Sequence, residues 1–164
     1  MSKAFTRESD EDGATELPER EVSSFPNLVT REGLALIEAA IERHSAEHAA
    51  ALSSSDNATT DKERAGRAAR ELRYWTQRRV SAQVTPPPAD SDEVRFGSSV
   101  TIEREDGRRQ TWRIVGEDEA DPQRGTLSHA SPLARALMGR EVGDVVQAGP
   151  AEAEIVSIEV PVAG

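Results

Sequence analysis

The sequence predicts an α+β protein in which two antiparallel helices form a coiled-coil hairpin, followed by an antiparallel β-sheet domain with one short helix. Three observations support this fold class. Apolar residues recur at helical spacing across residues 26–84, three consecutive prolines follow at 86–88, and the apolar pattern then changes to the alternation of strands. With 164 residues, the chain has room for two small domains.

The first helix has a clear start signal. Thr30 is a favourable N-cap, and Glu32 places an acid in the first turn, where the helix dipole stabilises it. One seam then recurs at steps of three or four residues: Leu34, Ile37, Ile41, His44, His48 and Leu52. This spacing predicts a helix of about 22 residues with one buried face.

A turn and a second helix follow. The polar run 53–57 predicts a turn, after which a helix extends from about Ala58 to Val84. Its predicted seam consists of small and large apolar residues together with one arginine: Ala65, Ala68, Leu72, Trp75, Arg79 and Ala82. Two helices with heptad-like seams and a short connection predict an antiparallel coiled-coil hairpin.

The domain boundaries follow from composition. Residues 1–25 are acidic and lack periodic apolar positions, which predicts a disordered tail. The hairpin comprises residues 26–84. Residues 85–91 contain three consecutive prolines, which cannot continue a helix and predict a stiff linker. The sheet domain then comprises residues 92–164.

The sheet domain is predicted from short local signals. Val94 to Ile102 alternates as a strand with a bend at Gly97, and an Asp-Gly turn at 106–107 leads to a returning strand over 111–115. An acidic loop follows. Ser131 and Pro132 suit the N-cap and first position of a short helix, which Gly139 ends. The last strands are expected at 142–146 and 153–160.

Composition excludes several classes of protein. Without cysteine, the chain has no disulfide framework, thiolate nucleophile or zinc–thiolate site. A net charge of −10 argues against sequence-specific nucleic-acid binding. No apolar run is long enough to span a membrane, and the N-terminus has no signal peptide, so we expect a soluble, cytoplasmic monomer. His44 and His48 lie one helical turn apart, but no third ligand is in register, so we expect no metal or cofactor.

Four stretches, in the same order, resemble the C-terminal domain of the Gre transcription elongation factors of bacteria: residues 94–100, 113–121, 131–139 and 140–144. The entry into the first helix at 28–33 and the end of the second at 82–84 resemble the Gre hairpin. The resemblance implies a sheet domain with the fold of FK506-binding proteins. It also implies a partner, RNA polymerase, with docking on the β′ subunit at the rim of the secondary channel while the hairpin enters that channel.

The resemblance also implies roles for individual residues. Glu119 and Asp121 match the acidic loop of the family, and Ser131 and Pro132 match its docking loop, so the resemblance implies that all four residues take part in polymerase docking. The two acids would also suit an ordinary solvated loop, and Ser131 and Pro132 would also suit an ordinary helix start. For these positions the docking role and the purely structural role therefore both stay open. Gre factors are not enzymes of their own. Acids at their hairpin tip help to hold the catalytic magnesium ion of the polymerase, which cleaves backtracked RNA.

The hairpin tip of this chain departs from the family pattern. Asp56 and Asp61 are its acids, but the Asp-x-x-Glu spacing of the family is absent. Asp56 also suits an N-cap, and Asp61 a first-turn acid. The hairpin is also shorter than in the family, and each residue lost from an arm lowers its reach by about 1.5 Å. We therefore expect modulation of elongation more than cleavage stimulation.

Several alternatives remain. The second helix is strongly basic and would contact polymerase or nucleic acid, or else form a solvated face paired with acids of the first helix: Glu38, Glu42 and Glu47. The chain would also fit an inhibitory secondary-channel regulator that does not promote cleavage, or an adaptor of the nucleoside diphosphate kinase regulator type. A third alternative is a two-domain protein with no polymerase role.

Overall fold

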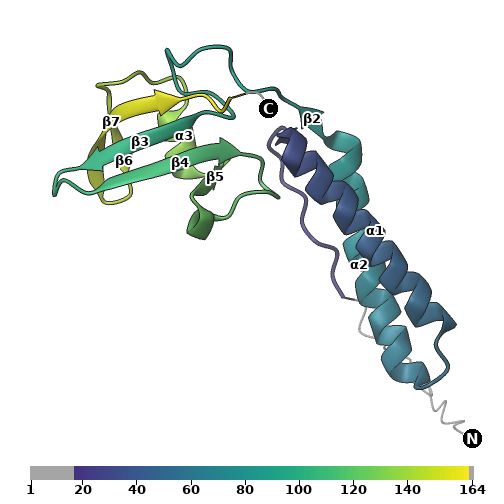
Figure 1. Ribbon diagram of the computed structural model, residues 1–164. Helices are drawn as coiled ribbons and strands as arrows, with labels where there is room; N and C mark the ends of the chain where they lie inside the picture. The colour runs from purple at the N-terminus through teal and green to yellow at the C-terminus, as the bar shows by residue number, and fades with distance from the viewer. Residues whose placement is uncertain (1–16, 163–164) are drawn as a thin grey trace, which may run out of the picture.

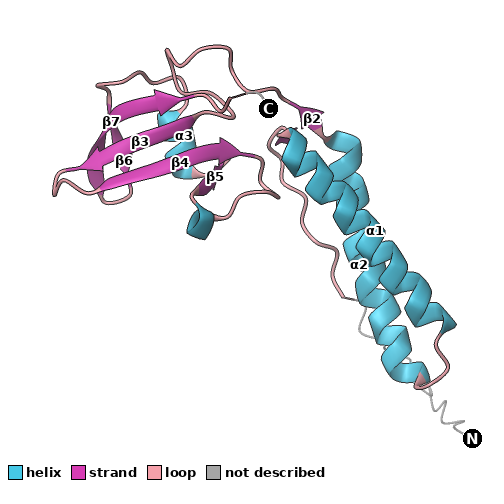
Figure 2. Cartoon of the chain, in the orientation of Figure 1, coloured by secondary structure: helices cyan, strands magenta, loops and turns pink. Residues whose placement is uncertain are grey.

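A computed structural model shows a long helical hairpin joined at its base to a small sheet domain (Figure 1). The structure describes residues 17–162. Helix α1 (Arg31–Ser53) runs from the junction to the far tip, and α2 (Ala58–Ser81) returns. The tip therefore lies at the end of the molecule opposite the sheet domain, as Figure 2 also shows.

The caps set the ends of the two helices. Thr30 is the N-cap of α1, as predicted, and its hydroxyl accepts a hydrogen bond from the amide of Gly33. Helix α2 is capped by Asn57 and not by Asp56, since the Asn57 side chain accepts from the amide of Thr60. It ends at Ser81, three residues before the predicted end, because the chain there turns into a short strand.

The hairpin seam follows the predicted spacing in its middle and departs from it at both ends. Ile37, Ala65 and Ala68 are buried between the helices. Leu52, however, is 67% exposed, and the neighbouring Ala51 is buried instead. At the other end Arg78, and not the predicted Arg79, is buried. In both cases the buried position differs from the predicted one by one residue. A helix has 3.6 residues per turn, so the face predicted from a seven-residue repeat drifts over several turns.

Two short strands join the ends of the hairpin. Strand β1 (Leu28–Val29) precedes α1, strand β2 (Gln83–Val84) follows α2, and the two pair in parallel. Amides of the second segment bond carbonyls of the first, from Gln83 to Asn27 at 2.8 Å and from Thr85 to Val29 at 2.9 Å. This pairing fixes the hairpin base against the start of the proline segment.

The sheet is mixed, which corrects the prediction of an antiparallel sheet. Its strand order is β5-β4-β3-β7-β6. The antiparallel strands are β3 (Ser99–Arg104), β4 (Arg109–Val115), β6 (Val145–Ala148) and β7 (Ala151–Glu159). The unpredicted β5 (Thr126–Ser128) pairs with β4 in parallel, after a crossover loop that contains the 3-10 turn η1 (Pro122–Arg124). Three residues are too few to show a strand period.

The core of the sheet domain lies between the sheet and helix α3 (Pro132–Leu137). Its members are mostly β-branched or leucine side chains, among them Ile102, Ile114, Leu137 and Ile155. Trp112 is only partly buried and packs on this cluster. Val94 and Phe96 are buried, but β3 begins at Ser99 and not at the predicted Val94, because the backbone turns at Gly97, whose φ is +89°.

Residues 17–25 differ from the disordered tail that the sequence predicts for residues 1–25. They form an extended segment along α2, which we call the strap. The reason is specific: Arg20 of the strap bonds Glu71 at 2.7 Å and lies 3.6 Å from the ring centre of Tyr74. The remainder of the predicted tail, residues 1–16, lies outside the described residues.

Two glycines permit the close approach of the two domains. A Cβ on Gly116 would lie 2.6 Å from the carbonyl oxygen of Leu28, and a Cβ on Gly33 would lie 2.8 Å from a carboxylate oxygen of Glu119. The first of these neighbours is backbone, which cannot move aside as a flexible side chain can. The base of the hairpin and the end of β4 therefore lie closer together than any residue with a Cβ would allow.

Gly116→Ala is expected to lower the free energy of unfolding by about 1–3 kcal/mol, because the new methyl group would overpack the domain junction. Gly66→Ala is the matched control. A Cβ on Gly66, within α2, would have no neighbouring atom within 4 Å, so alanine there should stabilise by about 0.5–1 kcal/mol. Urea unfolding of both variants checks the pair, and equal effects would contradict the close approach.

Candidate functional site

The acidic loop after β4 faces the base of the hairpin. Gly116 follows the strand, and Glu117, Asp118 and Glu119 then come in sequence before η1 begins. Turn hydrogen bonds to the carbonyl of Gly116, from the amides of Glu119 and Ala120, hold the loop in shape. The carboxylates are thereby presented to α2 and to the start of α1.

Arg78 lies at the centre of this junction, and its side chain is only 2% exposed. Its Nε donates to Asp118 at 2.5 Å, and its Nη2 donates to Asn27 at 2.7 Å and to Glu117 at 3.3 Å. The side-chain amide of Asn27 in turn donates to the carbonyl oxygen of Arg78 at 2.8 Å. A guanidinium from the hairpin is thus enclosed by the acidic loop on one side and by the segment before β1 on the other.

Tyr74 completes the network, one helical turn before Arg78. Its hydroxyl donates to the second oxygen of Asp118. Burial, together with this hydrogen bond to a carboxylate, raises the pKa of Tyr74 to about 12. Burial alone would disfavour the Arg78 cation, but the hydrogen bond and charge of Asp118 outweigh it and raise the pKa of Arg78. Both groups therefore keep their protons at neutral pH.

The two predicted docking acids have different surroundings. Glu119 accepts a 2.6 Å hydrogen bond from the hydroxyl of Thr30, the N-cap of α1, so it faces the hairpin. Asp121 caps η1 by accepting from the amide of Gln123 at 3.1 Å. Both residues are only partly exposed. Each therefore has a contact within the chain, and the acidic loop acts as a connector between the domains.

The predicted docking loop lies at the start of α3. Ser131 is the N-cap, accepting from the amide of Ala134 and donating to the carbonyl of Ser128 at 2.7 Å. Pro132 occupies the first turn and is exposed. The ring of His129, just before the loop, packs edge-on against Phe96, and burial lowers its pKa. The helix-start interpretation of Ser131 and Pro132 is therefore correct, while Pro132 remains accessible to a partner.

The two acids of the hairpin tip, Asp56 and Asp61, have different roles. Asp61 is buried, and its carboxylate accepts from the amide of Asn57 at 3.4 Å and from Arg64 at 3.2 Å. Hydrogen bonding to Ser54 is the main cause that lowers the pKa of Asp61. It is the first-turn acid of α2 and closes the tip loop. Asp56 is exposed, so of these two acids it alone is open to solvent.

The described residues contain no group of three or more His, Cys, Asp or Glu side chains that could hold a metal ion. His44 instead contacts Glu47 at 3.1 Å. Within the same part of the chain, no helix has the length and apolar character needed to cross a membrane.

Sequence comparisons identify relatives of this chain. The family described as transcription elongation factor GreA/GreB, C-terminal, matches residues 89–160. GreA of Paracoccus denitrificans is 38% identical over 104 residues, covering 56% of this chain and 67% of the relative. GreA of Alkalilimnicola ehrlichii is 42% identical over 106 residues, covering 57% and 67%.

The chain belongs to the GreA/GreB family.

The match to other members of the family is shorter. For GreB of Neisseria meningitidis serogroup B, the 42% identity covers 55% of this chain and 59% of the relative. Among solved structures, the GreA factor homolog 1 protein of Thermus thermophilus is 24% identical, with 85% of this chain and 99% of that chain covered. The TM-score of that superposition is low, at 0.39.

Sequence reasoning missed the central residues of the junction in this Gre-family chain. Arg79 was selected in place of its neighbour Arg78, and neither Tyr74 nor Asp118 was singled out. One clue was available, since a tyrosine and an arginine four residues apart lie on one face of a helix. The partner on that face was not predictable, because it comes from a loop 40 residues later in the chain.

Arg78→Met is expected to destabilise the Gre-family chain by about 3–5 kcal/mol, because it leaves the buried Asp118 carboxylate without its cation. Arg79→Met is the matched control. Arg79 pairs with Glu38 but is 48% exposed, so its loss should cost at most about 1 kcal/mol. Urea unfolding measures both, and similar costs for the two variants would contradict a buried junction.

The single tyrosine of the chain makes the junction directly observable. The phenol of Tyr74 should titrate near pH 12, and Asp118→Asn should move its pKa towards the usual value of about 10. Since the unfolded phenol titrates near 10, its contribution to stability is complete below that pH and is lost as pH rises to 12. Ultraviolet absorbance of the phenolate measures the pKa, and a midpoint at the usual value in the native chain would refute the contact.

Proposed function

We propose that this chain binds RNA polymerase at the secondary channel and modulates elongation there, docking on the β′ subunit at the channel rim. The observation that carries the proposal is the buried Arg78–Asp118 contact, which fixes a long hairpin to the domain that matches the Gre family. A projecting hairpin can act inside a channel only if docking of the sheet domain determines where its tip lies. A buried ion pair between the two parts supplies that constraint.

The reach of the hairpin follows from helix geometry. The 23 residues of α1 span about 35 Å at 1.5 Å per residue. The chain has no enzymatic activity of its own in this proposal. Its Pro132 surface docks, Ser131 sets the start of α3, and Glu119 and Asp121 shape the acidic loop. The hairpin then occupies the channel and affects the active centre of the polymerase.

The residues of the hairpin tip favour a regulator that occupies the secondary channel without strongly stimulating RNA cleavage. Magnesium is held by carboxylates that are free to approach it. Asp61 is committed to Asn57 and Arg64 within the tip, which leaves Asp56 as the exposed acid. We therefore propose a regulator that competes with cleavage-active Gre factors for the channel, and no cofactor of its own.

The test uses core RNA polymerase and stalled, backtracked complexes. The wild-type chain should bind the polymerase, produce little transcript cleavage and inhibit cleavage by an added active Gre factor. Pro132→Glu should weaken binding at least about tenfold, an effect of the size seen for an important interface residue. Pro150→Ala, at an exposed proline of the β6–β7 turn, is the control and should bind normally.

Two results would contradict this proposal. Strong cleavage that Asp56→Ala abolishes would show that the tip assists catalysis after all. Failure of the folded chain to bind polymerase would favour the adaptor class, in which the hairpin serves another partner.

A further inference from the structure

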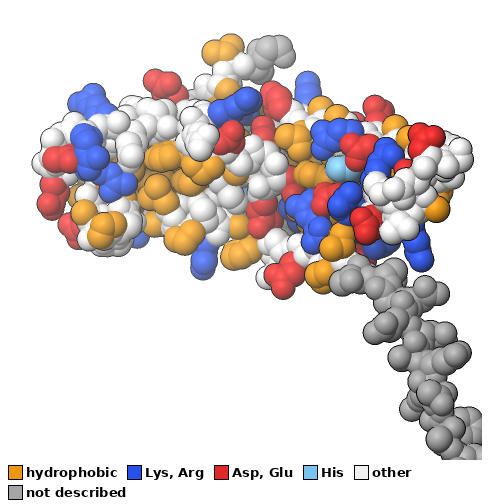
Figure 3. Space-filling view, turned by 90° about the horizontal axis from the view of Figure 1, so that it is seen from below, with side chains coloured by type: hydrophobic (Ala, Val, Ile, Leu, Met, Phe, Trp, Pro, Cys, Tyr) orange, Lys and Arg blue, Asp and Glu red, His pale blue; other side chains and the backbone are white. Residues whose placement is uncertain are grey.

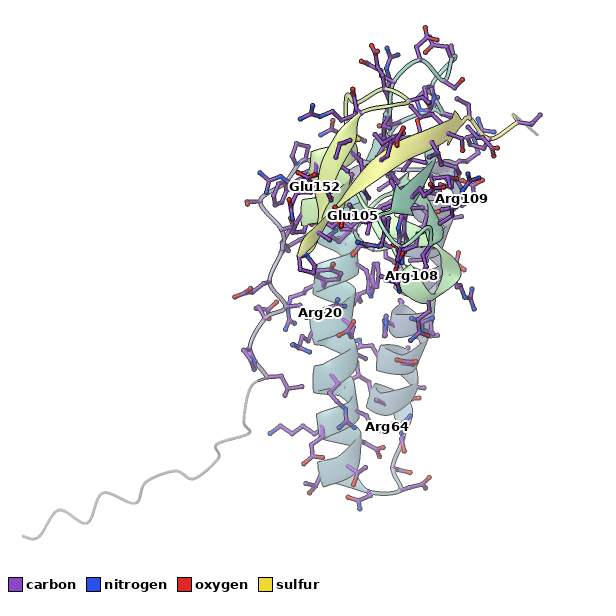
Figure 4. The ribbon with its side chains drawn as sticks, turned by 90° about the vertical axis from the view of Figure 1, so that its left-hand side faces the viewer. Arg20, Arg64, Glu105, Arg108, Arg109 and Glu152 are labelled. Carbon is purple, nitrogen blue, oxygen red and sulfur yellow. The ribbon has the colours of Figure 1, made fainter. Side chains whose placement is uncertain are left out.

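The strap ends on the sheet domain. In Figure 4 it passes Arg20 beside the hairpin and continues to the level of the sheet, and Figure 1 shows the same course. Its last residue, Phe25, meets helix α3 there, since the guanidinium of Arg135 lies over the Phe25 ring, 5.6 Å from its centre. A cation within about 6 Å of a ring centre is attracted to the ring. The strap therefore adds an aromatic side chain to the surface of the sheet domain.

Phe25 is held in place and is still open to solvent. Its amide donates to Oγ of Ser23 at 3.2 Å. Asn27, two residues later, is only 3% exposed and is bonded to Arg78 at the junction. Phe25 itself is 41% exposed. A side chain that is already ordered loses little conformational entropy when a partner binds it, so Phe25 is suited to anchor another protein.

Arg135 connects this ring to the proposed docking surface. Pro132 and Arg135 are both exposed, and their three-residue spacing puts them on one face of α3. Figure 3 shows hydrophobic side chains exposed over the sheet domain, whereas charged side chains of both signs gather over the hairpin. Pro132, Arg135 and Phe25 thus form a connected surface of a proline, a cation and an aromatic ring, which we call the extended docking face.

The charge of Arg135 is left for a partner. Its side chain forms no ion pair within residues 17–162, although acids outnumber bases by ten in the whole chain. A guanidinium beside an aromatic ring can bind a carboxylate of a partner while the ring packs on an apolar side chain. Aromatic residues and arginine are also the types that most often dominate the binding energy of protein interfaces.

We propose that Phe25 and Arg135 contact RNA polymerase, and that they extend the Pro132 docking surface to a polymerase site with a carboxylate beside an apolar side chain. This inference rests on the proposed function. The carboxylate pairs with Arg135, and the apolar side chain packs on the Phe25 ring. Phe25 precedes residue 28, where the resemblance to the Gre hairpin begins, and lies outside residues 89–160, which match the family. The contact is therefore additional to the docking residues that the resemblance implies.

The first experiment measures binding of the full chain to immobilised core RNA polymerase by surface plasmon resonance. Phe25→Ala should weaken binding about tenfold, as expected for the loss of an aromatic anchor. Val22→Ala is the matched control, because Val22 lies three residues earlier in the strap and has the same exposed fraction, 41%. It should bind within about twofold of the wild type, as most surface contacts do.

The second experiment tests the charge of Arg135. Arg135→Gln should weaken binding at least about threefold, and the remaining affinity should fall less steeply with added salt than that of the wild type. Arg108→Gln removes the same charge from the β3–β4 turn, where Arg108 is 73% exposed and lies far from the hairpin (Figure 4). This control should keep the affinity and salt dependence of the wild type. A purely structural role of Arg135 would not change the salt dependence.

Phe25→Leu separates a polymerase contact from a role in folding. This change keeps an apolar side chain and removes the ring. Weaker polymerase binding with an unchanged urea midpoint supports the contact. A lower urea midpoint with unchanged binding would mean that the ring only stabilises the fold, and would overturn the inference.

The remaining outcomes distinguish this inference from the proposed function. If Phe25→Ala binds as tightly as Val22→Ala while Pro132→Glu still binds weakly, the inference fails and the proposed function stands. Tighter binding by Phe25→Ala would also overturn the inference, because the strap would then obstruct docking. If the folded wild-type chain does not bind polymerase at all, the proposed function fails and the inference fails with it.

Discussion

The Arg78 guanidinium is the group on which the arrangement of the two domains depends. A buried cation is costly unless its donors find acceptors, and here Asp118, Glu117 and Asn27 supply them. These acceptors come from the loop after β4 and from the segment before β1. The cost of a half-formed network makes the junction an all-or-none feature. The hairpin is therefore held in one orientation instead of moving freely about the proline segment.

Other junction features follow from that contact. Asp118 uses one carboxylate oxygen for Arg78 and the other for Tyr74, so two successive turns of α2 face the same loop. Glu119, next in sequence, reaches the N-cap Thr30, which places the loop over the start of α1. The approach is close enough that glycine is required at 116. A loop that resembles a solvated acidic segment in sequence thus connects both helices to the sheet.

Local signals predicted the local structure of this chain well. Thr30 and Ser131 are N-caps as expected, and Gly97 marks a turn, because each signal acts on backbone groups within four residues. The failures depend on contacts between distant segments. The parallel strand β5, the burial of Arg78 in place of Arg79, and the ordered strap all depend on partners that sequence spacing does not indicate. For Asp61, sequence left two roles open, and its hydrogen bonds within the tip favour the structural one.

The chain contains two kinds of ion pair that differ in their burial, one at the domain junction and one along the strap. Around Arg78, removal from water makes the pairing strong and permanent, which suits a joint that must hold. Along the strap, the same kinds of side chain meet in water, where salt screens their attraction and the pairing is weak. If the contacts of Arg78 were exposed as well, the position of the hairpin tip relative to the sheet domain would not be fixed. Two arginines of α2, Arg73 and Arg78, thus form ion pairs of different strength, and only the buried pair of Arg78 fixes the hairpin to the sheet domain.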